Sequence, residues 1–262
     1  PGVPNHLHRS RVRLLGSTSK RELAKSLRER CDLLDWSPIV EAACESVIRA
    51  MRRGAAVEYS EENTASIATP WLVERLLMQG KTNCLYGPGG KGKGWLAITA
   101  AICVQTGTPL AGLATQQANV LYYDYEDDKA TFDQRVTMVC RGWKMPVPRI
   151  AYRHGSERLD TQVEWLSSFC SDENIGLLIV DSFTFAAGSN GERGGYEESA
   201  VRLLTAVRQL GGVTVLFVDH VTGDGTRSEA LVGKQYGSVM KQNLIRNNME
   251  VKQDQEMGET SW

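Results

Sequence analysis

The feature that most constrains this chain is a short run of glycines and lysines at residues 87–94, Gly-Pro-Gly-Gly-Lys-Gly-Lys-Gly. The run matches the pattern G-x-x-x-x-G-K-[ST] at every position except the last, where Gly94 replaces Ser or Thr. Glycines let successive backbone N–H groups turn towards phosphate oxygens, and the lysine neutralises the phosphates. The run therefore predicts a loop that binds a polyphosphate. The residues expected to contact it are Gly87, Gly89, Gly90, Gly92, Lys93, Gly94 and Trp95.

The residues on either side of the run support this interpretation. Residues 82–86 (TNCLY) predict a short buried strand, and residues 95–104 (WLAITAAICV) predict an apolar helix. A Gly/Lys turn without a ligand is the alternative, because short motifs of this kind occur by chance. Gly94 lacks the hydroxyl oxygen that coordinates Mg²⁺ in such loops, so hydrolysis of the polyphosphate is in question.

Strand and helix patterns alternate from residue 81 onwards. The expected strands are 82–86, 119–124, 149–152, 176–181, 213–219 and one near 248–253, and the expected helices are 95–106, 129–141, 160–171 and 195–210. Such alternation predicts an α/β fold with a mostly parallel twisted sheet and helices on both faces. Ligands of these folds bind at the carboxyl ends of the strands.

The first part of the chain has a different pattern, so we expect a helical N-terminal segment and linker at 1–64 and a second domain at 65–262. Residues 19–22 (SKRE) predict a capping box that opens a first helix reaching Leu34. A second helix is expected at 37–53, and a short third one at 70–80. Basic residues are dense between 9 and 30, where they either bind nucleic acid or solvate a helix face.

Composition excludes several classes of protein. With 30 Lys and Arg against 31 Asp and Glu, the chain is not basic overall, so any nucleic-acid contact must come from local patches. The six cysteines form no C-x-x-C pair and are expected to be reduced thiols. No apolar run reaches the ~20 residues that span a bilayer. We therefore expect a cytoplasmic protein without a membrane partner.

Acidic residues follow two of the expected strands. Asp181 ends the apolar strand at 176–181, where a carboxylate can hold the Mg²⁺ that bridges the phosphates. Glu126 follows the strand at 119–124 and is the better candidate for a general base that orients the attacking water. Asp127 and Asp128 are expected to start the next helix. The role of Asp124 stays open.

Histidine follows a third apolar strand, at 213–218. His220 stands at the tip of this strand, where it is placed to sense the γ-phosphate. His154 is interpreted as structural, because a lone histidine more often packs than reacts.

Together these motifs resemble the RecA-like hexameric ATPases, most closely the RepA-type replicative helicases that are common in plasmids and phages. The resemblance covers residues 66–257 and includes the phosphate loop, LYYDYED, LLIVDS, FVDHVT and QYGSVMKQNLIRN in that order. It implies ATP and Mg²⁺ as cofactors, with the roles of Lys93, Glu126, Asp181 and His220 as stated above. It also implies a homo-oligomer, a hexameric ring, in which Arg246 is the arginine finger that reaches the nucleotide of a neighbouring subunit. A surface ion pair is the alternative for Arg246.

The chain departs from the family pattern at four places. Family members carry Ser or Thr at the position of Gly94, a small residue at that of Lys91, and often a lysine at that of Gly223. The chain also ends at Trp262, before the last strands of such domains, so we expect it to be truncated at its C-terminus.

Two glycine-rich segments are candidates for contacts with single-stranded DNA. They span 186–196 and 222–236, positions that face the central channel in RecA-like rings. Their expected nucleic-acid contacts are Arg193, Tyr196, Arg227 and Lys234, through phosphate pairing and base stacking. Mobile surface loops of similar composition are the alternative.

We therefore predict an ATP-hydrolysing ring motor that acts on single-stranded DNA, a replicative helicase or an accessory translocase. Two other hypotheses stay open. The first is a nucleotide-binding assembly module with weak hydrolysis, because Gly94 weakens the metal site. The second is a recombinase-like filament protein. No helicase-specific chemistry is visible in the residues alone.

Overall fold

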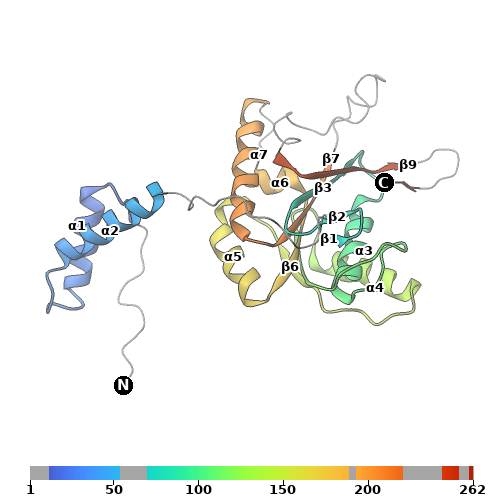
Figure 1. Cartoon of the computed structure of the whole chain (residues 1–262), viewed down its shortest axis with the longest axis horizontal. Helices are drawn as coiled ribbons and strands as arrows, with labels where there is room; N and C mark the ends of the chain where they lie inside the picture. The colour runs from blue at the N-terminus through green and yellow to red at the C-terminus, as the bar shows by residue number, and fades with distance from the viewer. Residues whose placement is uncertain (1–11, 54–69, 189–192, 221–243, 254–259, 262) are drawn as a thin grey trace, which may run out of the picture. The chain divides into compact units, whose positions relative to one another are not determined.

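The computed structural model describes residues 12–53, 70–188, 193–220, 244–253 and 260–261, and the structural statements below concern these residues. The chain divides into two compact units, Pro1–Ile67 and Ala68–Trp262 (Figure 1).

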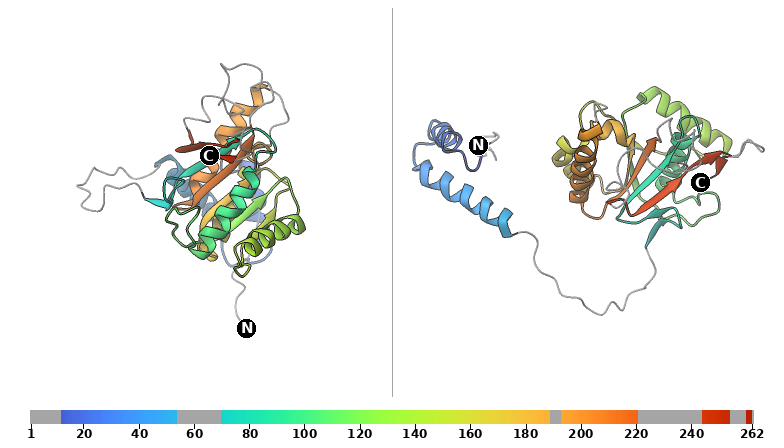
Figure 2. Two further views of the ribbon diagram at one scale, coloured as in Figure 1. Left: turned by 90° about the vertical axis from the view of Figure 1, so that its right-hand side faces the viewer. Right: turned by 90° about the horizontal axis from the view of Figure 1, so that it is seen from above.

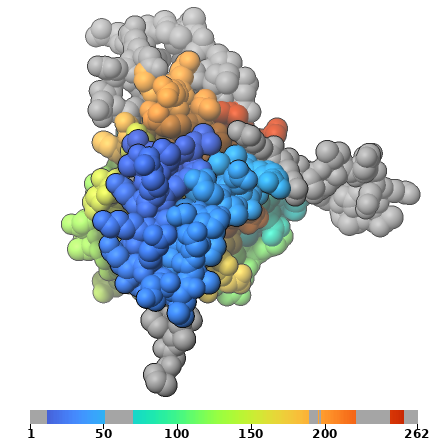
Figure 3. Space-filling view, turned by 90° about the vertical axis from the view of Figure 1, so that its left-hand side faces the viewer, coloured from blue at the N-terminus to red at the C-terminus, as the bar shows by residue number. Residues whose placement is uncertain are grey.

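The first unit contains two helices, α1 (Ser17–Arg28) and α2 (Trp36–Arg53), whose surface is coloured blue in Figure 3. They pack through a small core of Ala24, Val40 and Cys44, and Lys20 Nζ bonds Glu41 Oε2 at 2.6 Å. Only this small core is buried, so the pair contributes little apolar burial.

The predicted capping box at 19–22 is wrong. Helix α1 begins before Ser19, and its N-cap is Gly16, which makes no side-chain capping bond. The helix also ends at Arg28, so Leu34 lies outside it. The chain turns instead, and Trp36 Nε1 donates a hydrogen bond of 2.6 Å to the Cys31 carbonyl.

The second unit is built on six parallel strands. They are β3 (Thr82–Gly87), β4 (Asn119–Asp124), β5 (Ala151–His154), β6 (Ile175–Asp181), β7 (Thr214–His220) and β8 (Asn247–Glu250). Their order in the sheet is β5-β4-β6-β7-β3-β8. The strand that precedes the glycine run therefore lies between β7 and β8, with β7 separating it from β6. The predicted α/β fold with a parallel sheet is confirmed.

Helices cover both faces of this sheet (Figure 2). One face carries α3 (Lys93–Thr106) and α4 (Lys129–Gly142), and the other carries α5 (Val163–Asp172), α6 (Phe183–Ala187) and α7 (Arg193–Val207). Successive residues of a strand point to opposite faces. Accordingly Leu177 and Ile179 of β6 pack with α3, whereas Leu178 and Val180 pack with α5 and α7. This two-sided burial explains why β6 is apolar throughout.

Residues 70–80, predicted as a helix, form an antiparallel hairpin of β1 (Trp71–Val73) and β2 (Leu77–Met78). Arg75 turns the chain with φ of 59°, outside the helical region. The hairpin buries Leu72, Val73, Leu76 and Leu77 in the core. Tertiary packing and this turn override the local helical pattern.

Smaller differences affect element ends. The helix predicted at 160–171 is a 3₁₀ turn, η1 (Leu159–Thr161), followed by α5, and the one predicted at 195–210 is α7 followed by the 3₁₀ turn η2 (Arg208–Leu210). The last predicted strand is divided into β8 and β9 (Lys252–Gln253), and β9 pairs with β10 (Thr260–Ser261). Helix α6 was not predicted. Within the described ranges, no helix combines the length and apolar character needed to cross a membrane.

Candidate nucleotide-binding site

The sheet brings the predicted residues together because its strands are parallel and end at one edge. The register pairs Gly87 of β3 with His220 of β7, and Asp124 of β4 with Asp181 of β6. Glu126 follows β4 by two residues at the same edge. Residues from four strands thus meet where ligands of such sheets bind.

Glycine is required at different positions of the loop for different physical reasons. Gly90 and Gly92 have φ of 72° and 85°, a left-handed conformation that residues with a Cβ adopt at a cost. A Cβ at Gly87 would lie 2.6 Å from the Val251 carbonyl oxygen, so only glycine fits beside this backbone. The backbone of the loop therefore requires glycine at these three positions.

Lys93 is the first residue of α3 and its side chain folds back over the loop. Its Nζ donates to the carbonyls of Gly87 at 2.9 Å and Pro88 at 2.8 Å, and the residue is only 4 % exposed. Burial lowers the pKa of the ammonium, and the acids at the strand ends partly offset this effect. A buried ammonium at the positive end of a helix is suited to phosphate oxygens.

Asp181 lies at the end of β6 and is 7 % exposed. The Tyr122 hydroxyl donates a hydrogen bond of 2.8 Å to its Oδ2. Burial raises the pKa of this carboxyl to about 7. Tyr122 was not predicted as a site residue, although it lies two residues before Asp124 and so on the same face of the sheet.

Few side-chain oxygen donors lie at the predicted Mg²⁺ site. A Cβ on Gly94 would lie 3.6 Å from Asp181 Oδ2, so the missing hydroxyl would stand beside this carboxylate. Within the described part of the chain, no group of three or more His, Cys, Asp or Glu could hold a metal ion. The hydroxyl-and-carboxylate pair of a phosphate-loop metal site is therefore incomplete, and Asp181 alone remains.

Glu126 and His220 form a hydrogen-bonded pair between Oε1 and Nε2 at 3.1 Å. This bond is the largest cause that lowers the pKa of Glu126 below its ordinary value. Asp124, whose role the sequence left open, holds the turn that presents Glu126. Its Oδ1 accepts the backbone N–H groups of Glu126 at 3.0 Å and Asp127 at 2.9 Å.

The other polar residues near this turn have structural partners. Asp128 caps α4 by accepting the Thr131 N–H at 2.7 Å, as predicted. His154 Nδ1 lies 3.0 Å from the Asp127 carbonyl oxygen, which agrees with a structural role.

Asp127 has a partner that the sequence analysis missed, because its Oδ2 pairs with Arg135 Nη1 of α4 at 2.6 Å. Asp127 lies before the N-cap of α4, and eight residues exceed the three- or four-residue spacing of helical ion pairs, so local spacing gave no signal for this contact.

Arg246, the predicted arginine finger, is not brought to this loop. It is exposed just before β8, and its N–H donates to the Thr82 carbonyl at the start of β3. The glycine loop follows the opposite end of β3, so Arg246 cannot reach it within one chain.

The predicted nucleic-acid contacts are only partly visible. Arg193 and Tyr196 lie by backbone in the first turns of α7, and their side chains are outside the described part. Arg227 and Lys234 lie outside the described residues, as does the Gly237-Ser238 step of the resemblance.

Comparison with known proteins agrees with this fold. No curated protein matches the chain. The RecA-fold region resembles a KaiC-like protein of the hyperthermophilic archaeon Pyrococcus horikoshii OT3, with a TM-score of 0.51 and 16 % identity over 72 % of this chain and 79 % of that one. At that identity the likeness concerns the fold alone. Residues 49–226, more than half of the chain, match the AAA domain family. The chain therefore belongs to the AAA domain family and carries a RecA-like P-loop ATPase fold.

Proposed function

We propose that this protein is an ATP-hydrolysing ring motor that acts on single-stranded DNA, as a replicative helicase or accessory translocase of the RepA type. The family supports a nucleotide-binding ATPase. The motor function rests on one observation, the hydrogen bond between Glu126 and His220. It joins the candidate base to the last residue of β7, directly before the segment expected to contact DNA.

The residues of the site have complementary roles in this proposal. Lys93 exchanges its two loop carbonyls for oxygens of the β- and γ-phosphates. Glu126, whose carboxylate bonds His220, orients the attacking water and accepts its proton. His220 is then free to sense whether the γ-phosphate is present. Mg²⁺, held by Asp181 and the phosphates, would neutralise charge that develops during transfer.

The position of His220 at the end of β7 supports the proposed coupling to DNA. Phosphate release or binding changes the partner of its imidazole, and this change is passed to the backbone after residue 220. Residues 222–236, which include Arg227 and Lys234, begin there and supply the proposed DNA contacts. A histidine that exchanges one bonding partner for another at the start of this segment can couple the state of the nucleotide to DNA contacts.

The place of Arg246 supports the proposed assembly into a ring. Because it lies at the opposite end of β3 from its own loop, it can act only on the nucleotide of another subunit. Its planar donor fork suits the spread charge of phosphoryl transfer.

A second function, a nucleotide-binding assembly module with weak hydrolysis, is favoured by Gly94. This glycine leaves the space beside Asp181 without a hydroxyl oxygen. The two functions differ in turnover and in response to DNA, not in nucleotide binding.

The test is the ATPase rate of the wild type and of Gly94→Ser, each with and without single-stranded DNA, with Lys93→Ala as the control for contaminating activity. We expect slow hydrolysis that single-stranded DNA raises at least about threefold, and a further rise in Gly94→Ser. A Cβ at residue 94 makes only ordinary contacts, so the variant should fold. ATP binding without any response to DNA, and without unwinding of a forked duplex, would favour the assembly module instead.

A further inference from the structure

The space beside Gly94 is bordered by a cation as well as by a carboxylate. A Cβ at this position would lie 3.6 Å from Asp181 Oδ2 and 3.9 Å from Arg135 Nη1. The loop thus lacks its hydroxyl at the point where a guanidinium from α4 approaches.

Two contacts hold this guanidinium in place. Arg135 Nη1 pairs with Asp127 Oδ2 at 2.6 Å, and the guanidinium carbon lies 5.9 Å from the centre of the Trp95 ring. The Arg135 side chain is 31 % exposed, so it borders the site without being enclosed. Trp95 and Gly94 are adjacent at the start of α3, so this cation–π contact, together with the Asp127 pair, places the guanidinium next to the phosphate loop.

We propose that Arg135 binds the β/γ-phosphate oxygens beside Gly94 and supplies there the positive charge that a metal ion supplies in other phosphate loops. This inference rests on the proposed binding of ATP by residues 87–94. A guanidinium presents a planar donor fork that matches phosphate oxygens and stays charged at all relevant pH values. ATP therefore binds this protein with little dependence on Mg²⁺.

Calorimetric titration with ATP tests the inference directly, in excess Mg²⁺ and in EDTA. For the wild type we expect the two dissociation constants to agree within about threefold. Arg135→Ala should weaken binding in EDTA by about tenfold or more, and Mg²⁺ should recover part of this loss. Gly94→Ser should gain a preference for Mg²⁺, because its hydroxyl returns an oxygen ligand beside Asp181.

Removing Arg135 also leaves Asp127 unpaired near the phosphates, and that charge alone would weaken binding. The pair Asp127→Asn and Asp127→Asn/Arg135→Ala separates the two effects, because both variants lack the acid. In EDTA the double variant should still bind ATP about tenfold more weakly than Asp127→Asn does. Arg135→Lys should recover only part of the affinity, since it keeps the charge and loses the fork.

Arg141→Ala is the matched control, because Arg141 is an exposed arginine in the last turn of the same helix. It should bind ATP like the wild type in both buffers. Two results together would overturn the role of Arg135 while leaving the proposed function intact. The wild type would bind ATP in Mg²⁺ but about tenfold or more weakly in EDTA, and Asp127→Asn and the double variant would bind ATP equally well. A wild type that binds no ATP in either buffer overturns the proposed function as well.

Discussion

Glu126 Oε1 lies 3.1 Å from His220 Nε2, although 94 residues separate them in the chain. The contact exists because β4 and β7 are parallel strands of one sheet, on either side of β6, and end at the same edge. Because the two side chains bond directly, a change in the partner of one residue alters the environment of the other. The pair is therefore the point at which hydrolysis and the segment after β7 can influence each other.

Replacing His220 by alanine should make the rate of ATP hydrolysis independent of DNA. We expect ATP affinity to change less than about threefold, because Lys93 and the glycines still hold the phosphates. The hydrolysis rate should fall about tenfold or more, and stimulation by single-stranded DNA should disappear. Rates measured with and without DNA check this. His154→Ala is the control, since the His154 ring contacts the Asp127 carbonyl rather than Glu126, and equal effects of the two variants would contradict the role of His220.

Lys93→Ala should abolish ATP binding or weaken it at least about tenfold, a loss of about 1.4 kcal/mol or more. The reason is that Lys93 is the loop lysine in register with the glycines, and its ammonium sits buried over the loop. Lys91→Ala removes the other loop lysine and should weaken binding less than about threefold. Calorimetry on both variants checks this, and unchanged affinity in Lys93→Ala would exclude the loop as the phosphate site.

Mixing two inactive variants should restore part of the activity. Glu126→Gln lacks the base and Arg246→Ala lacks the finger, so each alone should lose about a hundredfold or more in rate. Mixed rings contain some interfaces that pair an intact base with an intact finger, so part of the rate returns. The measurement is ATPase activity against mixing ratio, with sedimentation to show co-assembly. Two results would show that Arg246 is a surface residue and not an arginine finger. One is mixed oligomers that regain no ATPase activity, and the other is a protein that stays monomeric at micromolar concentration with ATP.

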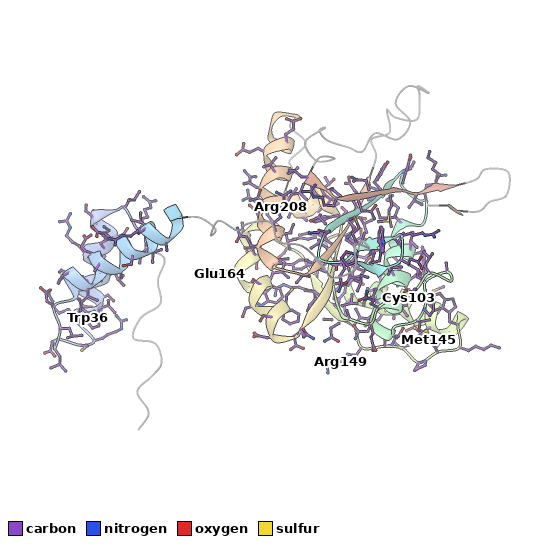
Figure 4. The ribbon with its side chains drawn as sticks, in the orientation of Figure 1. Trp36, Cys103, Met145, Arg149, Glu164 and Arg208 are labelled. Atoms are coloured by element: carbon purple, nitrogen blue, oxygen red, sulfur yellow. The ribbon has the colours of Figure 1, made fainter. Side chains whose placement is uncertain are left out.

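Cysteine labelling should follow burial and pKa. Burial raises the pKa of Cys103, labelled in Figure 4, and of Cys170 to about 11. At pH 8 only about one thiol in a thousand is then ionised, and maleimides react with the thiolate. Cys31 is the only cysteine that is not buried. It should therefore be modified first in the native protein, and all six cysteines should react in urea. Mass spectrometry of peptides checks this, with Cys31→Ser as the control.

Much of the second unit could be predicted from local patterns, because β4, β6 and β7 are short, mostly apolar runs that end in Asp or His, and β3 leads into the glycine loop. The glycine loop, Asp181, Glu126 and His220 were identified for the same reason, since each follows such a run. The hairpin at 70–80 could not be predicted in this way. Its residues have helical spacing, and only packing against the core, with a left-handed Arg75, selects strands.

The sequence by itself determined the parallel α/β fold and the loop with its missing hydroxyl, because periodicity and glycine spacing are local properties of the chain. Only the tertiary structure decided that Asp124 holds a turn, that Tyr122 bonds Asp181, and that Arg135 stands beside Gly94. These contacts join separate elements across the end of the sheet. Their geometry depends on strand order and register, which no single segment of the sequence encodes.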